Sequence, residues 1–334
     1  MTQLRKPYLI YLGDAAEPVL AKTAFGVRDW APQDCLAQWR LPECKVDLGL
    51  PDKEPAAAAE IGARSLLLGI APGGGRIPPA WVPGLRKAVE AGLDIVSGLH
   101  SRLEDVEGLA DLAAKHNVRL INIRTPPKNL PVGNGIKRSG KRLLTVGTDC
   151  ALGKKYTALT ITKALQSRGI AADFRATGQT GILIAGSGVP LDCVVADFVA
   201  GAIEQITPAA ADDHWDIIEG QGSLFHPGYA GVTLGLVHGS QPDALILCHD
   251  PTRKHIAYHP HAAMPSLKLA ATRYIEAAQL NNANVKLVGV SLNTSALSQA
   301  ERERALSQAE HELGVPSFDP LKTSSDSVIQ RMLE

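Results

Sequence analysis

Apolar residues in the first third of the chain fall into short runs that alternate with amphipathic stretches. The runs "YLIYLG", "SLLLGIA", "LDIVSGL" and "VRLINIR" have the length of buried strands. Between them, "EPVLAKTAF", "LRKAVEAG" and "LEDVEGLADLAAKHN" carry apolar residues at helical spacing. Strands that alternate with helices form βαβ units around a parallel sheet. We therefore predict an α/β domain with a mainly parallel sheet over residues 1–124.

A second alternation of the same kind follows a polar segment. Residues 125–142, "TPPKNLPVGNGIKRSGKR", are rich in Pro, Gly and basic residues without apolar periodicity, which is typical of a linker. Beyond it, "RLLTVGTDC", "IAADFRATG", "DIIEG", "ALILCHD" and "VKLVGVSLN" read as buried strands. Helical patterns such as "KKYTALTITKALQSRG", "LKLAATRYIEAAQL" and "ERERALSQAEHEL" separate them. We predict a second α/β domain over residues 143–334.

The composition of the chain argues against some classes of binding partner. The 334 residues include 34 basic and 34 acidic side chains, so the chain has no global field to attract nucleic acid or an anionic membrane. No apolar run approaches the roughly 20 residues of a membrane-spanning helix. The five cysteines are scattered and include no C-x-x-C pair. We expect a reduced, cytoplasmic protein with no nucleic-acid partner, no membrane partner and no bound metal.

The stretch "GTDCALGKKYT" joins a buried strand to the start of a helix. Backbone N–H groups at such a turn, together with a lysine, bind phosphate oxygens. The pattern departs from G-x-x-x-x-G-K-[ST], because Lys155 occupies the position of the hydroxyl that binds magnesium. Thr157 lies about 300° round the helix from Lys154 and is a poor substitute. The candidate cofactor-binding residues are Gly147, Thr148, Asp149, Cys150, Gly153, Lys154, Lys155, Tyr156 and Thr157.

Two further segments combine glycine with polar side chains directly after a strand. The first, "FRATGQTG", offers donors to an anionic substrate, and its alternative is a flexible loop that leads into a buried helix. The second, "DIIEGQGSLFH", provides Glu219 as a candidate general base or metal ligand and His226 as an acid/base group. A helix cap or a surface ion pair is the alternative for Glu219, and a structural histidine for His226. The candidate substrate-binding residues are Arg175, Thr177, Gly178, Gln179, Thr180, Gly220, Gln221, Gly222 and Ser223.

Three weaker features complete the candidates. "SLNTSALS" ends a strand in Asn293 and Thr294, where an amide either recognises a base edge or caps a turn. "DIVSGLHSRL" places His100 just beyond a strand, where it could contact substrate or belong to a capped helix start. "LCHDPTRKHIAYHPH" is rich in histidine, but its spacing fits no zinc pattern, so a solvated or substrate-edge loop is favoured.

The loop "GTDCALGK" resembles the phosphate loop of dethiobiotin synthetase, GTDTGVGKT, which is related to the cobyric acid synthases and the partition ATPases. Cys150, Ala151 and Lys155 depart from that pattern. The resemblance implies an E-G-x-G segment after the Walker B strand, matched here at Glu219. It also implies an adenine-reading Asn at the end of a later strand, matched at Asn293.

Over its whole length the chain resembles the DgcN-type D-glutamate N-acetyltransferases. The match is carried by "PYLIYLGDA", "SGLHSRL", "KRSGKRLLTVGTDCALGKKYTAL", "DFRATGQTGILIAG", "DHWDIIEGQGSLFHPGYAGVTLGLVHGSQPDALILCHDPTR" and "SLNTSALS". The resemblance implies a Rossmann-like N-terminal domain, a P-loop domain similar to dethiobiotin synthetase, and transfer of acetyl from acetyl-coenzyme A to D-glutamate. It further implies hand-off of the product to an N-acetylglutamate racemase, and we expect a homo-oligomer.

The residues tolerate that activity. Coenzyme A carries a 3′-phosphate and a pyrophosphate, which backbone N–H groups with Lys154 and Lys155 can bind without magnesium. Acetyl transfer to an amine needs a base, for which Glu219 or His226 is the candidate. N–H groups near Gly220 to Gly222 are candidates for the oxyanion, and Arg175 with Lys155 for the substrate carboxylates.

Three other functions stay open at this point. One is a ligase or kinase of the dethiobiotin synthetase type, which would need Mg²⁺ and ATP and release ADP. Another is a nucleotide-responsive P-loop switch without small-molecule turnover. The last, nicotinamide-dependent oxidoreduction, rests only on the run Gly73 to Gly75, which is not a G-x-G-x-x-G motif.

Overall fold

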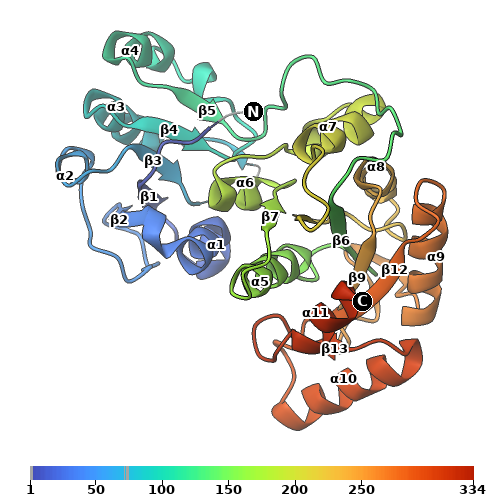
Figure 1. The fold of residues 1–334 in the computed structure, drawn as a ribbon. Helices are drawn as coiled ribbons and strands as arrows, with labels where there is room; N and C mark the ends of the chain where they lie inside the picture. The colour runs from blue at the N-terminus through green and yellow to red at the C-terminus, as the bar shows by residue number, and fades with distance from the viewer. Residues whose placement is uncertain (1–2, 71, 73–74) are drawn as a thin grey trace. The chain divides into compact units, whose positions relative to one another are not determined.

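The chain folds into two compact units, which are described here from a computed structural model (Figure 1). The structure describes residues 3–70, 72 and 75–334. The first unit comprises Met1–Pro127 with Gln179–Cys193, and the second Lys128–Gly178 with Val194–Glu334. Gly73 and Gly74 of the triple glycine lie outside the described residues.

The first unit is built on a parallel sheet of five strands in the order β2-β1-β3-β4-β5. From β1 the chain moves to β2 at one edge of the sheet, and it then returns past β1 to β3, β4 and β5. Because the crossover connections are right-handed, α1 lies on one face of the sheet, and α3 and α4 lie on the other. α3 packs against β4 and α4, and α1 packs against α6. The strands are β1 Tyr8–Gly13, β2 Cys35–Arg40, β3 Ser65–Leu68, β4 Asp94–Ser97 and β5 Leu120–Asn122. The helices are α1 Lys22–Trp30, α2 Pro55–Glu60, α3 Val82–Glu90, α4 Leu109–His116 and α6 Gln179–Ala185.

The segment Gln179–Cys193 belongs to the first unit although the sequence places it within residues 143–334. Its helix α6, "QTGILIA", is mostly apolar and buries Ile182 and Leu183. Tyr8 Oη donates to Leu183 O at 3.2 Å, and Lys6 Nζ donates to Ile184 O at 3.1 Å. The second half of the chain thus contributes a helix to the first sheet, because this apolar helix finds its packing surface there.

The second unit contains a parallel sheet of six strands in the order β13-β12-β9-β6-β8-β7, and an antiparallel β10-β11 hairpin (Figure 1). β6 is central, so the loop after it opens at the middle of the carboxyl edge of the sheet. The strands are β6 Lys141–Gly147, β7 Ala172–Arg175, β8 Trp215–Ile218, β9 Ala244–His249, β10 His255–Ile256, β11 His259–Ala263, β12 Lys286–Leu292 and β13 Ser317–Phe318. The helices are α5 Lys154–Gln166, α7 Val199–Ile206, α8 Ala230–Ser240, α9 Leu267–Gln279, α10 Gln299–Leu313 and α11 Asp326–Leu333.

Helices cover both faces of this sheet. Leu143, Ile217 and Ile246 point to one face and form a core with the apolar sides of α5 and α11. The alternate residues Leu144 and Leu245 are equally buried and point to the other face, where α8 contacts β6 and α9 contacts β9 and β12. Two parallel sheets, the second enclosed between helical layers, confirm the predicted α/β class.

The predicted linker belongs largely to the second unit. Lys141 and Arg142 are already strand residues of β6. Lys137 Nζ donates to Asp243 Oδ1 at 2.7 Å, and Arg138 Nε donates to Thr207 O at 2.7 Å. The basic side chains that look like linker composition therefore fasten this segment to the second unit.

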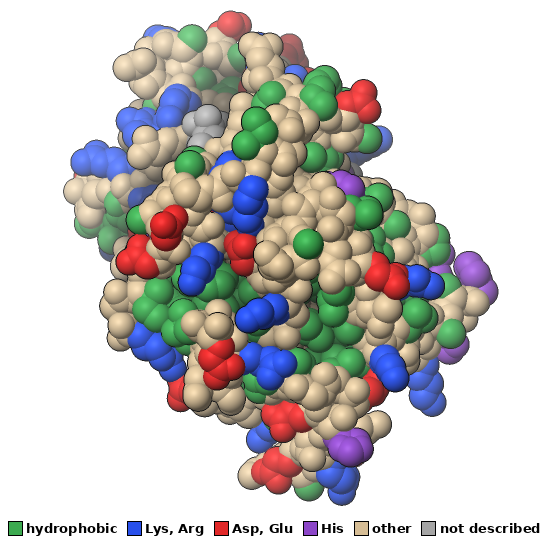
Figure 2. Space-filling model, turned by 45° about the vertical axis from the view of Figure 1, so that its right-hand side comes forward, with side chains coloured by type: hydrophobic (Ala, Val, Ile, Leu, Met, Phe, Trp, Pro, Cys, Tyr) green, Lys and Arg blue, Asp and Glu red, His purple; other side chains and the backbone are tan. Residues whose placement is uncertain are grey.

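The surface agrees with the balanced composition. On the face that Figure 2 shows, acidic and basic side chains are interspersed, and neither sign forms a continuous field. Within the described parts of the chain, no helix has the length and apolar character that crossing a bilayer requires.

Candidate active site

The loop after β6 exposes a run of backbone N–H groups at the start of α5. Ala151 and Gly153 are left-handed, with φ of 53° and 102°, and Gly153 is the N-cap of the helix. Within the described residues, the N–H groups from Ala151 to Lys155 have no hydrogen-bond acceptor. Consecutive free N–H groups at a helix N-terminus attract an anion. The local geometry is thus that of an anion-binding cradle.

Two lysines flank the cradle in different environments. Lys154 is 6% exposed, and its Nζ donates to Asp149 O at 2.7 Å. Burial lowers the pKa of Lys154. Burial also lowers the pKa of Lys155, and the carboxylate of Glu219 opposes that shift. Lys155 Nζ lies 4.8 Å from the centre of the Tyr156 ring. Lys155 therefore interacts electrostatically with Glu219, which the motif alone does not indicate.

Asp149 holds the loop in shape. Its buried carboxylate accepts hydrogen bonds from Cys150 N at 2.6 Å, Ala257 N at 2.7 Å and Arg253 Nη1 at 2.7 Å. Arg253 also donates to Cys150 O at 2.7 Å. Sequence reasoning did not single out Arg253, because it lies in the polar stretch "LCHDPTR", which reads as a solvated loop. Asp149 and Arg253 act on the loop backbone, and the cradle depends on them.

Tyr274 of α9 is a second residue that sequence reasoning missed. Its Oη donates to Gly147 O at 2.8 Å and accepts from Leu224 N at 3.1 Å. Burial raises the pKa of Tyr274 to about 12, so it remains a hydrogen-bond donor. It ties the start of the loop to the segment after β8. In the sequence, Tyr274 looks like one more apolar position of an amphipathic helix.

Glu219 follows β8 and is buried beside the cradle, with 4% of its surface exposed. Its Oε2 accepts from Thr177 N at 3.0 Å and Gly178 N at 3.1 Å. Within the described part of the chain, the hydrogen bonds of the carboxylate go to Oε2, which leaves Oε1 for a reactant. Burial raises the pKa of Glu219, against the opposing charge of Lys155. A desolvated carboxylate with a raised pKa is suited to accept a proton.

The residues around Glu219 need glycine for close approach. Gly220 N donates to Thr145 Oγ1 at 2.9 Å. A Cβ at Gly220 would overlap Thr145 O and lie 3.0 Å from Lys154 Cδ. A Cβ at Gly178 would lie 2.6 Å from Gln221 Nε2, and that amide donates to Thr177 Oγ1 at 3.2 Å. The Gly220 N–H is thus already paired within the fold, contrary to the expectation that it serves an oxyanion.

His226 and Cys150 meet at the start of the cradle. Asp149, Cys150 and His226 each place one polar atom within 4.8 Å of the other two. His226 is 2% exposed and stacks on Tyr229 at 4.3 Å between ring centres. Burial raises the pKa of the Cys150 thiol, while Lys154 and Arg253 favour its ionised form. The structure therefore brings the two candidate acid/base residues, Glu219 and His226, to the same loop.

Thr157 points away from the cradle into the sheet. Its Oγ1 bonds Ser291 Oγ at 2.7 Å and donates to Gly153 O at 3.2 Å. The side chain is fully buried. It is therefore not positioned as the hydroxyl ligand that magnesium has in G-K-[ST] loops, in agreement with its expected position on the helix.

Arg175 is engaged elsewhere. Its Nε donates to Asp216 Oδ1 at 2.6 Å, and its Nη2 lies 3.0 Å from Asp173 Oδ2. These acidic residues lie opposite each other on β7 and β8. This geometry does not support the expectation that Arg175 binds a substrate carboxylate, because its guanidinium is already bonded to two carboxylates of the sheet.

Other predicted residues at this edge make internal contacts. Thr148 Oγ1 bonds His249 Nδ1 at 2.9 Å, and Thr294 Oγ1 donates to Asp319. Asn293 Oδ1 accepts from Ser295 N at 3.2 Å, as a turn-capping Asn does. Ser223 Oγ accepts from Phe225 N at 3.2 Å. Gly222 is left-handed with φ of 63°. These residues shape the edge of the sheet.

Three predicted substrate residues belong to the first unit. His100 is exposed after β4, and its N donates to Gly75 O at 2.9 Å. Gln179 and Thr180 open α6. A Cβ on Gly98 would overlap Gln179 Oε1, so α6 lies directly against the segment "SGLHSRL". Two motifs distant in sequence thus meet within the first unit.

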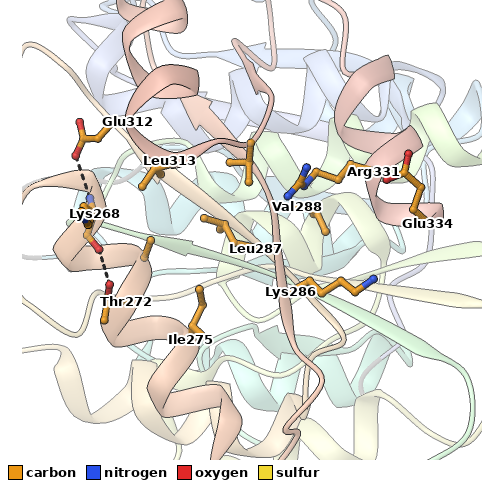
Figure 3. A pocket seen from close by; sticks show the side chains of 12 residues that line it. Lys268, Thr272, Ile275, Lys286, Leu287, Val288, Glu312, Leu313, Arg331 and Glu334 are labelled. Atoms are coloured by element: carbon orange, nitrogen blue, oxygen red, sulfur yellow. Dashed lines mark hydrogen bonds between the residues drawn. The ribbon is translucent and has the colours of Figure 1, made fainter.

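A cavity of about 580 Å³ lies at the other end of β12 and is separate from the cradle. It is lined by the first residues of β12, one side of α9 and the ends of α10 and α11 (Figure 3). Its labelled lining residues are Lys268, Thr272, Ile275, Lys286, Leu287, Val288, Glu312, Leu313, Arg331 and Glu334. In parallel sheets ligands bind at the carboxyl edge, so the cradle and not this cavity is the candidate active site.

Two family models match the chain. The model of DUF1611_C, a domain of unknown function described as a P-loop domain, matches residues 131–329. The model of DUF1611_N, described as a Rossmann-like domain, matches residues 39–126.

Similar proteins extend the match to the full chain. A D-glutamate N-acetyltransferase of Pseudoalteromonas sp is 46% identical over 330 residues, which is 99% of this chain and 99% of that protein. One of Tritonibacter scottomollicae is 47% identical over 329 residues, 98% and 99% of the two chains. The crystal structure of a DUF1611 family protein from Anabaena variabilis is 32% identical, with a TM-score of 0.85 and coverage of 98% and 99%.

Proposed function

Since the chain belongs to the DUF1611 family, we propose that it is an N-acetyltransferase that moves acetyl from acetyl-coenzyme A to the amino group of D-glutamate. The observation that carries the proposal is identity of 46% and 47%, over nearly the whole chain, to two proteins named D-glutamate N-acetyltransferase. Similarity that spans both units supports the same reaction and the same acceptor.

The cradle supports an anionic reactant that arrives without magnesium. The free N–H groups from Ala151 to Lys155 and the ammonium of Lys154 suit phosphate oxygens. Lys155 replaces the hydroxyl that would bind Mg²⁺, and Thr157 is committed to Ser291. We assign the phosphates of coenzyme A to this cradle, in preference to Mg²⁺-ATP.

Glu219 is the base in this proposal. The amino group of D-glutamate is an ammonium at neutral pH and must lose a proton before it reacts. Glu219 Oε1 takes that proton, and its raised pKa makes the carboxylate a stronger base than an exposed one. The amine then attacks the thioester carbonyl carbon, the C–N bond forms and the C–S bond breaks. The second proton of the amine passes to the departing sulfur, so coenzyme A leaves as a free thiol. Lys155, which interacts electrostatically with Glu219, is our candidate to bind a substrate carboxylate.

One assay separates the proposal from ATP-dependent chemistry. Purified protein is mixed with D- or L-glutamate and either acetyl-coenzyme A or Mg²⁺-ATP, while free thiol and ADP are followed. We expect thiol release with acetyl-coenzyme A and D-glutamate. ADP release without thiol contradicts the proposal, and equal rates with L-glutamate contradict the assigned stereochemistry.

The product defines the next reaction. An N-acetylated D-amino acid has an amide in place of its amine, so enzymes that act on free D-amino acids no longer accept it. We propose that a racemase for N-acetylglutamate consumes it. Adding such a racemase to the assay should convert the product to a mixture of its D and L forms without further consumption of acetyl-coenzyme A.

A further inference from the structure

The imidazole of His226 is fixed in a buried position. It stacks on Tyr229 with ring centres 4.3 Å apart, and the ring of His259 stands edge-on to it at 5.0 Å. The Asp149 carboxylate and the Cys150 thiol each place one atom within 4.8 Å of a ring nitrogen of His226. A ring held from two sides has one orientation, so the hydrogen bonds of its two nitrogens define its protonation state.

Those hydrogen bonds distinguish the nitrogens. Nδ1 accepts from Gly228 N at 3.1 Å, which requires a lone pair on Nδ1. A neutral imidazole then carries its proton on Nε2. Nε2 is buried and has no partner within the described residues. A buried N–H without an acceptor is rare in folded proteins, and it indicates that an acceptor arrives with a ligand.

The donors near the His226 ring fit an oxyanion. Cys150 lies within 4.8 Å of a ring nitrogen of His226 and directly precedes the free N–H groups that begin at Ala151. A metal ion would need a lone pair on Nε2, which this tautomer lacks. The carboxylate of Asp149 is paired with the guanidinium of Arg253 at 2.7 Å, so its negative charge is compensated and does not exclude an oxyanion from this place.

We propose that His226 is a neutral hydrogen-bond donor through Nε2 and that it completes, with the N–H groups of the loop, a site for an oxyanion. The site rests on the proposed acetyl transfer for the identity of that oxyanion. It is either a phosphate oxygen of coenzyme A or the oxygen that develops on the thioester carbonyl during attack. His226 is then not the base, and the proton of the substrate goes to Glu219.

The tautomer is measured without reference to activity. Protein labelled with ¹⁵N-histidine gives separate Nδ1 and Nε2 signals for each imidazole, and the His226→Gln variant identifies those of His226. We expect Nε2 to carry the proton and Nδ1 to be unprotonated at neutral pH. A proton on Nδ1, alone or in an imidazolium, overturns the proposal.

Two ligands distinguish the sources of the oxyanion. S-acetylpantetheine carries the thioester without phosphates, and adenosine 3′,5′-bisphosphate carries phosphates without a thioester. A shift of the His226 Nε2 signal and of the amide signals of Ala151 and Leu152 with one of them supports the site and names its source. No shift with either ligand, or with acetyl-coenzyme A, removes the oxyanion site.

The activity of two variants separates a donor from a base. The side-chain amide of Gln keeps an N–H donor but cannot accept a proton at neutral pH. We expect His226→Gln to retain kcat/KM within about tenfold and His226→Ala to lose about 10²-fold or more, the usual effect of removing an oxyanion donor. The exposed neighbour His261 provides a control, and His261→Gln should be unaffected. Equal large losses in both His226 variants restore the base role and overturn the proposal. If the wild type itself transfers no acetyl group, the proposed function fails while the tautomer result stands.

Discussion

Glu219 is the side chain on which the proposed chemistry depends most, because its buried carboxylate combines a raised pKa with a free Oε1. We predict that Glu219→Gln lowers kcat by about 10² to 10⁴, since a carboxamide cannot take the ammonium proton. The amide oxygen can still accept from Thr177 N and Gly178 N, so the fold should be preserved. Glu276→Gln, on the exposed side of α9, is the control. A turnover close to wild type in Glu219→Gln excludes Glu219 as the base.

The same carboxylate makes stability depend on pH. Burial raises the pKa of Glu219 above its ordinary 4.5, so the folded state binds this proton more tightly than the unfolded state. The stability that this provides is complete below that ordinary value and is lost as pH rises through the raised one. We predict that Glu219→Gln gains thermal stability relative to wild type as pH increases over this window. Melting temperatures measured from acid to neutral pH test this, and a constant difference contradicts it.

Lys155 distinguishes this loop from a magnesium-binding one. We predict that Lys155→Ala raises KM for acetyl-coenzyme A by roughly tenfold, the loss of about 1.4 kcal/mol of binding. The substitution should also raise the pKa of Glu219 further, because Lys155 opposes the burial effect. The acid limb of kcat/KM should then move to higher pH. Lys268→Ala, on the exposed surface of α9, controls for general loss of charge. If KM for acetyl-coenzyme A is unchanged, Lys154 is the lysine of the cradle that binds the phosphates. If the acid limb of kcat/KM does not move, Lys155 does not affect the pKa of Glu219.

Among the elements, the end of β8 packs against strand β6 without room for a side chain at Gly220. A Cβ at Gly220 would overlap Thr145 O, while nothing lies within 4 Å of a Cβ at Gly231 in α8. We predict that Gly220→Ala unfolds at a much lower denaturant concentration than wild type. For Gly231→Ala we predict a free energy of unfolding about 0.5–1 kcal/mol higher than that of wild type. Gly178→Ala should fall between them, because the amide that it meets, Gln221, can move. Equal stability of the Gly220 and Gly231 variants would contradict the close packing.

An ion pair strengthens the connection between the loop and the segment after β9, beside the hydrogen bonds that Asp149 and Cys150 O accept there. Arg253 Nη1 lies 2.7 Å from Asp149 Oδ2, with the aspartate buried and the arginine 26% exposed. Breaking a buried pair costs about 3–5 kcal/mol, and the exposure of Arg253 reduces our expectation for Arg253→Met to about 2–3 kcal/mol. Adding Asp149→Asn should restore part of that loss, because no uncompensated carboxylate then remains buried. Denaturant unfolding of the four proteins gives the coupling energy, and strictly additive losses argue against the pair.

At the level of elements, sequence patterns predict the strands, turns and helices that depend on neighbouring residues in the chain. The strand, turn and helix around Thr148 and Lys154 follow from apolar runs, a glycine and a helical period, and the structure has them in that order. Arg253 and Tyr274 were missed because their roles depend on which backbone atoms tertiary packing places opposite them. The sequence indicated Arg175 as a substrate-binding residue because it does not show that Asp216 lies beside Arg175 on the neighbouring strand.

At the scale of the whole molecule, the alternation of strands and helices along the sequence predicts the number and class of the domains. It does not predict that α6 belongs to the first unit. The pattern "QTGILIA" shows that a helix is buried, without showing which sheet it is buried against. A helix from the second half of the chain packs in the first unit because Tyr8 and Lys6 bind its carbonyl groups there. Such long-range pairings cannot be read from a single sequence.

Because α6 belongs to the first unit, we can predict how the second unit behaves when it is produced alone. In a fragment of residues 128–334, α6 loses the packing partners that it has in the first unit, and the buried side chains of Ile182, Leu183 and Ile184 become exposed. We predict that this fragment aggregates and binds a hydrophobic dye. Replacing residues 179–193 with a short Gly-Ser linker should yield a monodisperse fragment with the circular dichroism of an α/β fold. Aggregation of both fragments to the same degree would show that the second unit needs more from the first than a place for α6.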